Sequence, residues 1–254
     1  MKSLRYIVVA LLVLVSSNAL AWTAEVNKAV LMLAEENLSG KAKKEVGALL
    51  GASLSSVEFV NKGESSYRLD ENGKSVTTDE KDAVVRLEKA IATLQDKSAS
   101  TSERQKALRE AVELTVDIHC LGNLSIDKHL DKEFTFSRHN AMQVNFRYYI
   151  VRKRSWKDLW HESFHDALGA FSSDMYLYDW HIATKGKAKA YKGEAVAPRK
   201  WAEQTGERAF AMLKIIQPDA LIESVEVSKL DEVNNSCIYD AVFRLANLLN
   251  KTLK

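Results

Sequence analysis

Two histidines and a glutamate in the second half of the chain stand at a spacing suited to zinc chemistry. His161, Glu162 and His165 spell His-Glu-x-x-His, the pattern of zinc proteases. On a helix both imidazoles lie on one face, and the glutamate is placed to act as a general base. No flanking zincin pattern or clear third ligand follows, and only Asp179 and His181 are near in sequence. An ordinary histidine pair on a surface helix is the favoured interpretation, and a protease site is the alternative.

The chain has only two cysteines, Cys120 and Cys237. In an oxidising compartment two such cysteines can form a disulfide. Two buried thiols are the alternative, and the sequence does not decide between them. His119, His129 and His139 have no partner that the sequence identifies.

Aromatic residues gather in the region that precedes residue 182. A cluster of this kind can stack on unpaired bases, but tryptophans at helical spacing are more often part of a core. We therefore expect a core role for these residues: Trp156, Trp160, Tyr176, Tyr178 and Trp180.

Apolar residues recur at helical spacing along most of the chain. The spacing predicts helices around 26–33, 84–94 and 108–118, and further helices over roughly 156–182, 199–216 and 238–253. Only two prolines occur, and Pro198 lies at the start of a predicted helix, where proline is favoured. The sequence therefore predicts an all-α, single-domain, multi-helix fold.

One stretch changes to the periodicity of a strand. Between residues 137 and 154, apolar side chains at Val144, Phe146, Tyr148 and Ile150 alternate with more polar neighbours. We expect one small β-hairpin there. Residues 51–79 and 122–137 are predicted to be long connections.

The first 21 residues have the features of a signal peptide. Lys2 and Arg5 precede an apolar run that is shorter than the roughly 20 residues of a membrane span. We expect cleavage before Trp22, a mature domain of residues 22–254, a secreted or periplasmic location and no membrane span. The mature chain carries 34 basic and 34 acidic residues, so it lacks a basic field that attracts nucleic acid from a distance.

Several segments, taken in order, resemble the S-one/P-one nuclease family, the mung-bean-nuclease type. Their order and spacing carry the resemblance more than any single motif. The segments are Trp22, Ala34-Glu35-Glu36-Asn37-Leu38-Ser39-Gly40-Lys41-Ala42-Lys43-Lys44, Ala107-Leu108-Arg109 with Val116-Asp117-Ile118-His119, Asn140 to Phe146, Trp156 to Trp160, Trp201-Ala202-Glu203 and Arg244-Leu245-Ala246-Asn247-Leu248-Leu249-Asn250. The resemblance implies the helical fold that this family shares with bacterial phospholipase C.

The resemblance also implies a zinc cluster that hydrolyses phosphodiester bonds in single-stranded DNA or RNA and in 3'-nucleotides. Zinc in such a site turns bound water into hydroxide and stabilises the charged transition state. Family members use the amino and carbonyl groups of the N-terminal tryptophan as ligands, here Trp22. Glu113 and Asp117 lie one helical turn apart, where the family has a histidine and a bridging aspartate. The implied metal positions are Trp22, Glu113, Asp117 and His161, with Asp117 as the catalytic residue.

The other ligand positions hold residues that bind zinc poorly. In place of histidine or aspartate the chain has Asn27, Lys62, Ser66, Asn123 and Lys157, and His161 replaces an aspartate. Only Trp22 and Asp117 keep the family's residue type. We therefore expect the zinc that the family requires to be reduced or absent here.

Two of these replacements bring positive charge towards the expected metal. We expect Lys62 and Lys157 to pair with Glu113 and Asp117 and so to stabilise the carboxylates without zinc. Lysines that point to solvent are the alternative.

The sequence therefore predicts an exported, nuclease-type protein with a degenerate metal site and weak or no hydrolase activity. Its expected partners are single-stranded nucleic acid or nucleotides. One alternative is an active phosphodiesterase with a reduced zinc site of Trp22, Glu113, Asp117 and His161. A second alternative is a zinc protease acting through residues 161–165.

Overall fold

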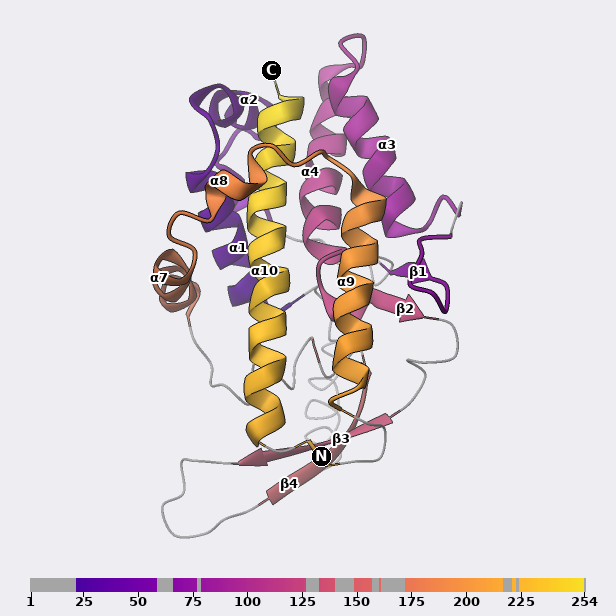
Figure 1. Ribbon diagram of the computed structural model, residues 1–254. Coiled ribbons are helices and arrows are strands. Elements are labelled where there is room, and N and C mark those ends of the chain that lie inside the picture. The colour runs from indigo at the N-terminus through magenta and orange to yellow at the C-terminus, as the bar shows by residue number, and fades with distance from the viewer. Residues whose placement is uncertain are drawn as a thin grey trace, which may run out of the picture.

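The computed structural model describes residues 22–58, 66–76, 79–126, 133–139, 149–156, 160, 172–216, 221–222 and 224–253. The prediction of an all-α protein with a small β element is confirmed. Long helices lie side by side, and a small sheet closes the lower end of the bundle (Figure 1).

The first two helices begin where hydroxyl side chains cap them. Helix α1 (Ala24–Glu36) follows Thr23, and α2 (Gly40–Leu50) follows Ser39. Each hydroxyl accepts a hydrogen bond from a backbone N–H of the first turn that would otherwise lack a partner. Gly51 ends α2 with a φ of 70°, a conformation that glycine adopts without strain. A short 3-10 helix, η1 (Leu54–Ser56), follows.

Helices α3 (Ala83–Gln95) and α4 (Thr101–Asp117) form a packed pair. Helix α4 begins with a capping box, in which Ser100 and Glu103 each bond the backbone N–H of the other. Its buried residues include Leu108, Ala111 and Leu114, as the apolar spacing predicted.

The second half of the chain adds α7 (Ser173–Ala183), the short α8 (Ala188–Tyr191), α9 (Pro198–Leu213) and α10 (Ser224–Thr252). Pro198 is the first residue of α9, a position where its missing N–H costs nothing. Helix α10 begins well before the predicted residue 238, because polar residues in its first half hide the apolar spacing.

The predicted antiparallel pairing is present, between β3 (Glu133–His139) and β4 (Tyr149–Ser155). Strand β5 (Leu221–Ile222) joins β3 in parallel, and β1 (Tyr67–Leu69) pairs in parallel with β2 (Leu124–Ile126), which follows η2 (Leu121–Asn123). Residues 51–79 and 122–137 were predicted to be long connections, but the first segment contains β1 and the second contains β2 and the start of β3. Strands as short as β1 and β2 show no periodicity in the sequence. The predicted strand positions Val144, Phe146 and Tyr148 lie outside the described residues.

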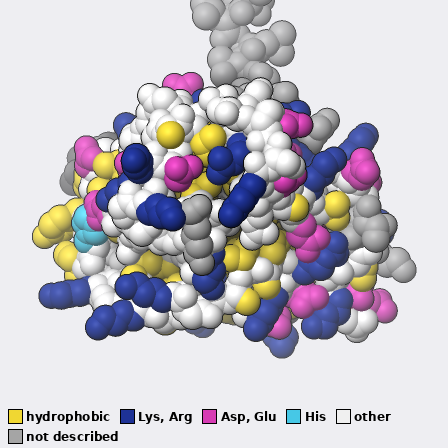
Figure 2. All heavy atoms as spheres, turned by 90° about the horizontal axis from the view of Figure 1, so that it is seen from above, with side chains coloured by type: hydrophobic (Ala, Val, Ile, Leu, Met, Phe, Trp, Pro, Cys, Tyr) yellow, Lys and Arg dark blue, Asp and Glu magenta, His cyan; other side chains and the backbone are white. Residues whose placement is uncertain are grey.

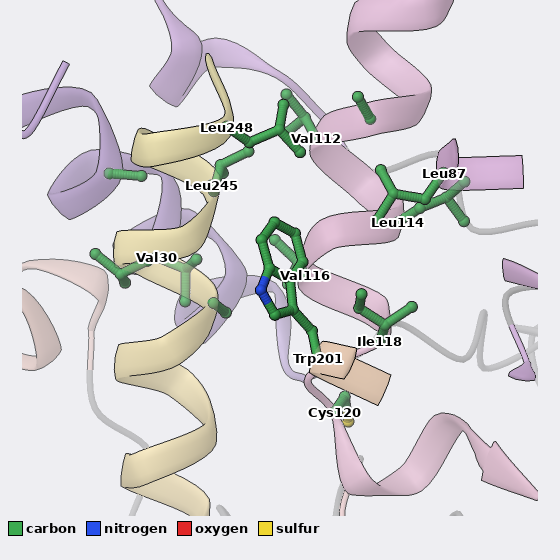
Figure 3. Close-up of a cluster of buried hydrophobic side chains, with 14 of the residues drawn as sticks. Val30, Leu87, Val112, Leu114, Val116, Ile118, Cys120, Trp201, Leu245 and Leu248 are labelled. Carbon is green, nitrogen blue, oxygen red and sulfur yellow. The ribbon is translucent and has the colours of Figure 1, made fainter. Parts of the chain in front are cut away.

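The core lies where α1, α4, α9 and α10 meet (Figure 3). The indole of Trp201 from α9 is fully buried there, with Val116 from α4 and Leu245 from α10 beside it. Helix α9 also approaches β1 very closely, because a Cβ added at Gly206 would lie 2.2 Å from Cδ1 of Leu69. Side chains buried at this density stabilise the fold by about 1.5–3 kcal/mol each.

Candidate functional site

The start of α1 holds two of the predicted ligand positions together. The side chain of Asn27 donates a hydrogen bond from Nδ2 to the carbonyl oxygen of Trp22 at 3.1 Å. The indole Nε1 of Trp22 donates to Oδ1 of Asn234 on α10 at 3.0 Å. Trp22 is 1% exposed and Asn27 is 2% exposed. The start of α1 is therefore tied to α10 by a buried hydrogen bond between Trp22 and Asn234.

A cavity of about 410 Å³ opens beside this turn. Its polar lining comes from both sides, namely Glu25, Asn27 and Lys28 of α1 and Ser55, Ser56 and Glu58 at η1. Within the described part of the chain, Oδ1 of Asn27 accepts no hydrogen bond although it is buried. An unmet buried acceptor costs about 1–3 kcal/mol, so this atom is suited to a donor group of a bound molecule.

A second pair of predicted positions lies at the end of α4. Asp117 is buried, and Glu113 stands one turn earlier on the helix, half-buried. Asn123 in η2 donates from Nδ2 towards Asp117, at 3.4 Å to Oδ1 and 3.3 Å to the backbone oxygen. An amide N–H of Asn123 therefore points at a carboxylate oxygen of Asp117.

The described residues do not fit a zinc cluster. Zinc needs lone pairs from imidazole, thiolate or carboxylate groups. At the positions of Asn27 and Asn123, the side chains instead donate N–H groups to the neighbouring predicted ligands. Among the residues that the structure describes, no group of three or more His, Cys, Asp or Glu side chains is arranged to hold a metal ion.

The remaining predicted positions divide into one described residue and several outside the described part. Ser66 is exposed just before β1, and its backbone oxygen accepts a hydrogen bond from the N–H of Ala83 at 3.1 Å. Lys62, Lys157, His161, Glu162 and His165 lie outside the described residues, as does the segment 140–146. The lysine ion pairs and the protease motif therefore stay predictions.

The expected aromatic core is present for the tryptophans. Trp156, Trp160 and Trp180 are buried, and the rings of Trp156 and Trp160 meet edge to face at 5.4 Å. Tyr178 is the exception, since 67% of it is exposed.

A second polar region is centred on Arg244 of α10, which is almost fully buried. Its guanidinium pairs with Asp240 at 3.0 Å and with Glu194 at 2.9 Å. A neighbouring pair, Arg208 with Asp240 at 2.8 Å, extends the network from α9. Tyr191 donates its hydroxyl to Asp240 at 2.6 Å. A shallow cavity of about 510 Å³ lies over these groups.

His119, which follows the end of α4, joins this network through Arg244. Its Nδ1 lies 2.6 Å from the backbone oxygen of Thr115, so Nδ1 carries the proton and donates. Its Nε2 therefore accepts from Arg244, at 3.1 Å. Burial, together with the charge of Arg244, lowers the pKa of His119 to about 3. The imidazole is thus neutral at physiological pH.

Two other groups of the network, Asp240 and Tyr191, also have shifted pKa values. Burial alone would raise the pKa of Asp240, but Arg208 and Arg244 hold that pKa below its ordinary value. Burial and the bond to Asp240 raise the pKa of Tyr191. A carboxylate held by two arginines and an imidazole with both nitrogens engaged are poor bases, so this region is suited to holding helices together.

Sequence reasoning gave His119 no partner and missed the network. One signal was present, since Asp240 and Arg244 are charged residues four apart within the mainly apolar second half of α10. Their partners come from distant segments, which no local pattern identifies.

The two cysteines are both buried and free. The predicted alternative of two buried thiols is therefore the one that the structure has, and the disulfide is not formed. Burial raises the pKa of Cys120, and it raises the pKa of Cys237 to about 11 although Arg208 donates to that sulfur at 3.7 Å. Such thiols are poor nucleophiles.

No family model and no curated protein sequence matches the chain. In the described part of the chain, no helix is long and apolar enough to cross a membrane.

Proposed function

We propose that this chain is an exported protein of the S-one/P-one nuclease type in which amide hydrogen bonds replace the metal, and that it binds nucleotides or single-stranded nucleic acid with little or no cleavage. One observation carries the proposal. At two positions where the resemblance expects histidine, Asn27 and Asn123 turn N–H groups towards Trp22 and Asp117.

The direction of these hydrogen bonds opposes metal binding. A metal ion and an N–H group compete for the same oxygen lone pairs, and an N–H group that points at a ligand repels a cation beside it. Asparagine also offers only a neutral oxygen, which zinc binds weakly. The amides of Asn27 and Asn123 therefore stabilise the remaining ligand positions without zinc.

The cavity at the start of α1 supports a binding role. It offers a buried acceptor at Asn27, hydroxyl groups at Ser55 and Ser56 and an ammonium group at Lys28. A nucleobase amino group matches the acceptor at Asn27. A phosphate matches the ammonium and hydroxyl groups, but only away from the carboxylates of Glu25 and Glu58 in the same lining. Cavities of about 300–1,000 Å³ accommodate small ligands.

The first experiment measures zinc and hydrolysis in the same preparation. The chain beginning at Trp22, without a histidine tag, is dialysed and analysed for zinc, then incubated with single-stranded DNA, RNA and 3'-nucleotides with added zinc. We expect no stoichiometric zinc and no hydrolysis above a protein-free zinc control. Stoichiometric zinc that survives dialysis would overturn the proposal.

Binding is measured separately by titrating 3'-nucleotides into the same protein. We expect Asn27→Leu to weaken binding, because it removes the buried acceptor, and Asn72→Leu in an exposed turn to have no effect. Binding that is unchanged in Asn27→Leu would place the ligand elsewhere.

A restoration experiment tests whether the amide donors of Asn27 and Asn123 prevent zinc binding. The double variant Asn27→His with Asn123→His replaces two N–H donors by imidazoles that can present lone pairs to a metal. We expect it to bind zinc more tightly than the parent chain. The matched control, Asn37→His with Asn72→His, places the same number of histidines outside the proposed site.

A second candidate function rests on the carboxylates of α4. Glu113 and Asp117 stay one turn apart with Asp117 buried, so a reduced phosphodiesterase site is the alternative. That candidate requires zinc-dependent hydrolysis that Asp117→Asn abolishes. The zinc protease alternative requires casein cleavage that Glu162→Gln abolishes.

A further inference from the structure

Helix α7 carries large apolar side chains on both of its faces. Trp180 is buried against the body of the protein, with Tyr176 and Leu177 half-buried beside it. On the outer face, Met175 is 51% exposed, Tyr178 67% and Ile182 64%. These three residues are spaced three and four apart, so they form one stripe along the helix, which we call the α7 stripe.

The α7 stripe is held rigidly at the edge of the molecule. Helix α7 packs on α1, and its first residue, Ser173, donates its N–H to Glu25 of α1 at 2.9 Å. Near its other end, His181 bonds Glu36 of α1 at 2.6 Å. Figure 1 places α7 at the outer left of the bundle. The apolar side chains are therefore exposed on a fixed, convex helix, and they do not belong to a loose end.

A basic segment follows the stripe directly. Lys185, Lys187, Lys189 and Lys192 are all exposed, and no acidic residue occurs between Asp179 and Glu194. We call these four residues the lysine segment. Together with Asp174 and Asp179 of α7, it gives this part of the chain a net charge of +2, in a mature chain that is neutral overall.

The two features lie on one side of the molecule. Helix α8, which carries Lys189, follows α7 after a turn at Gly186, where φ is 80°. Figure 2 shows hydrophobic side chains at the left edge, where α7 lies, with Lys and Arg side chains below them. Apolar insertion and cationic contact are thus available to the same partner.

We infer that the α7 stripe and the lysine segment together form a docking surface for an anionic lipid membrane. A helix lying in the membrane interface buries its apolar face among acyl chains, while neighbouring lysines contact lipid phosphates. Tyrosine is well suited to this boundary, because its ring is apolar and its hydroxyl remains in water. Lysine stems bend so that the ammonium groups reach the headgroups.

The shape and charge of the surface favour a membrane over a second copy of the chain. A convex, single-helix stripe enters a deformable lipid layer without a complementary groove. A second copy whose stripe packed in parallel on this one would bring the two lysine segments together, and like charges repel. This inference does not depend on the proposed nucleotide binding.

Vesicle flotation of the mature chain tests the inference. The probes are phosphatidylcholine vesicles and mixed phosphatidylcholine–phosphatidylglycerol vesicles at low and high salt. We expect binding to the mixed vesicles only, and weaker binding at high salt. Each of two triple variants should reduce binding about tenfold or more. These are Met175→Ser/Tyr178→Ser/Ile182→Ser and Lys185→Gln/Lys189→Gln/Lys192→Gln.

Matched controls distinguish binding through this surface from non-specific binding to vesicles. Val76→Ser removes an exposed apolar residue elsewhere, and Lys41→Gln/Lys43→Gln/Lys44→Gln removes three exposed charges from α2. Both controls should bind as the parent chain does, and circular dichroism and the Tm should show all variants folded. Three outcomes would overturn the inference: no binding, equal binding to both vesicle types, or a dimer in solution that the α7 substitutions dissociate.

Discussion

The start of α1 and the Arg244 network are both buried and polar, but they differ in how completely their groups are paired. At the start of α1, Oδ1 of Asn27 finds no donor among the described residues and lies beside a cavity. In the network, Arg244 contacts Asp240, Glu194 and His119. A paired network holds helices together, whereas an unmet group beside a cavity can receive a ligand.

The comparison also shows that a shifted pKa does not by itself mark a functional site. His119 has a pKa lowered to about 3, yet both of its nitrogens are engaged within the fold. At the start of α1, Trp22 and Asn27 are neutral groups that carry no such shift. Whether a polar group is already hydrogen-bonded, and whether a cavity lies beside it, are therefore better guides to a binding site in this molecule than a shifted pKa.

The largest expected effect is the loss of Arg244. Arg244→Met removes the guanidinium that pairs with Glu194 and one of the two that pair with Asp240, and breaking such a network costs about 3–5 kcal/mol of unfolding free energy. Urea denaturation measures the loss. Arg199→Met, which breaks an exposed pair with Glu88, is the matched control and should cost about 0–1 kcal/mol. Equal losses in the two variants would mean that the network contributes no more than a surface pair.

The second effect is a pH dependence set by His119. Its pKa is about 3 in the folded chain against 6.5 as an ordinary value, so between these pH values only the unfolded chain binds the proton. Stability is fully present above pH 6.5 and falls as the pH drops, by about 1.4 kcal/mol per pH unit. His119→Gln keeps a donor and an acceptor but does not titrate, so it should flatten this slope. A slope that is the same in both proteins would contradict the assignment.

A smaller effect distinguishes the two hydrogen bonds at Trp22. Asn234→Leu leaves the buried indole N–H unpaired and should cost about 1–3 kcal/mol. Asn27→Leu removes one hydrogen bond but also the unmet acceptor, so we expect about 1 kcal/mol or less. Denaturation curves of the two variants give the order. A larger cost for Asn27→Leu would show that its acceptor is satisfied in the folded chain.

The smallest effect concerns the thiols beside the network. Because Cys120 and Cys237 are free, a reducing agent should change the unfolding free energy by less than about 0.5 kcal/mol, far below the 2–5 kcal/mol of a lost disulfide. Maleimide should label both residues only after denaturation. A mass two hydrogens lower than that of the free chain would reveal a bond.

Helices were predictable wherever one face is continuously apolar, as in α1, α3 and α4. The first half of α10 was missed because residues such as Lys229 and Asp231 interrupt that face. The hairpin was predicted from the alternation of apolar residues that ends at Ile150 in β4, whereas β1 and β5 are too short to show a pattern. The Arg244 network was not predicted, because Arg244 and His119 are 125 residues apart and their meeting depends on the whole bundle.

The buried contact between Trp22 and Asn234 also constrains when the chain can fold. The two residues are 212 positions apart, and Asn250 of α10 donates to the carbonyl oxygen of Asn37 at the end of α1 across 213 positions. Helix α1 therefore cannot complete the burial of its apolar face until α10 has been synthesised. Contacts of such long range slow folding, and until they form, the exposed apolar face of α1 is prone to aggregation. For a chain exported as we propose, that delay is an advantage, since translocation through a secretory channel requires a chain that has not yet folded.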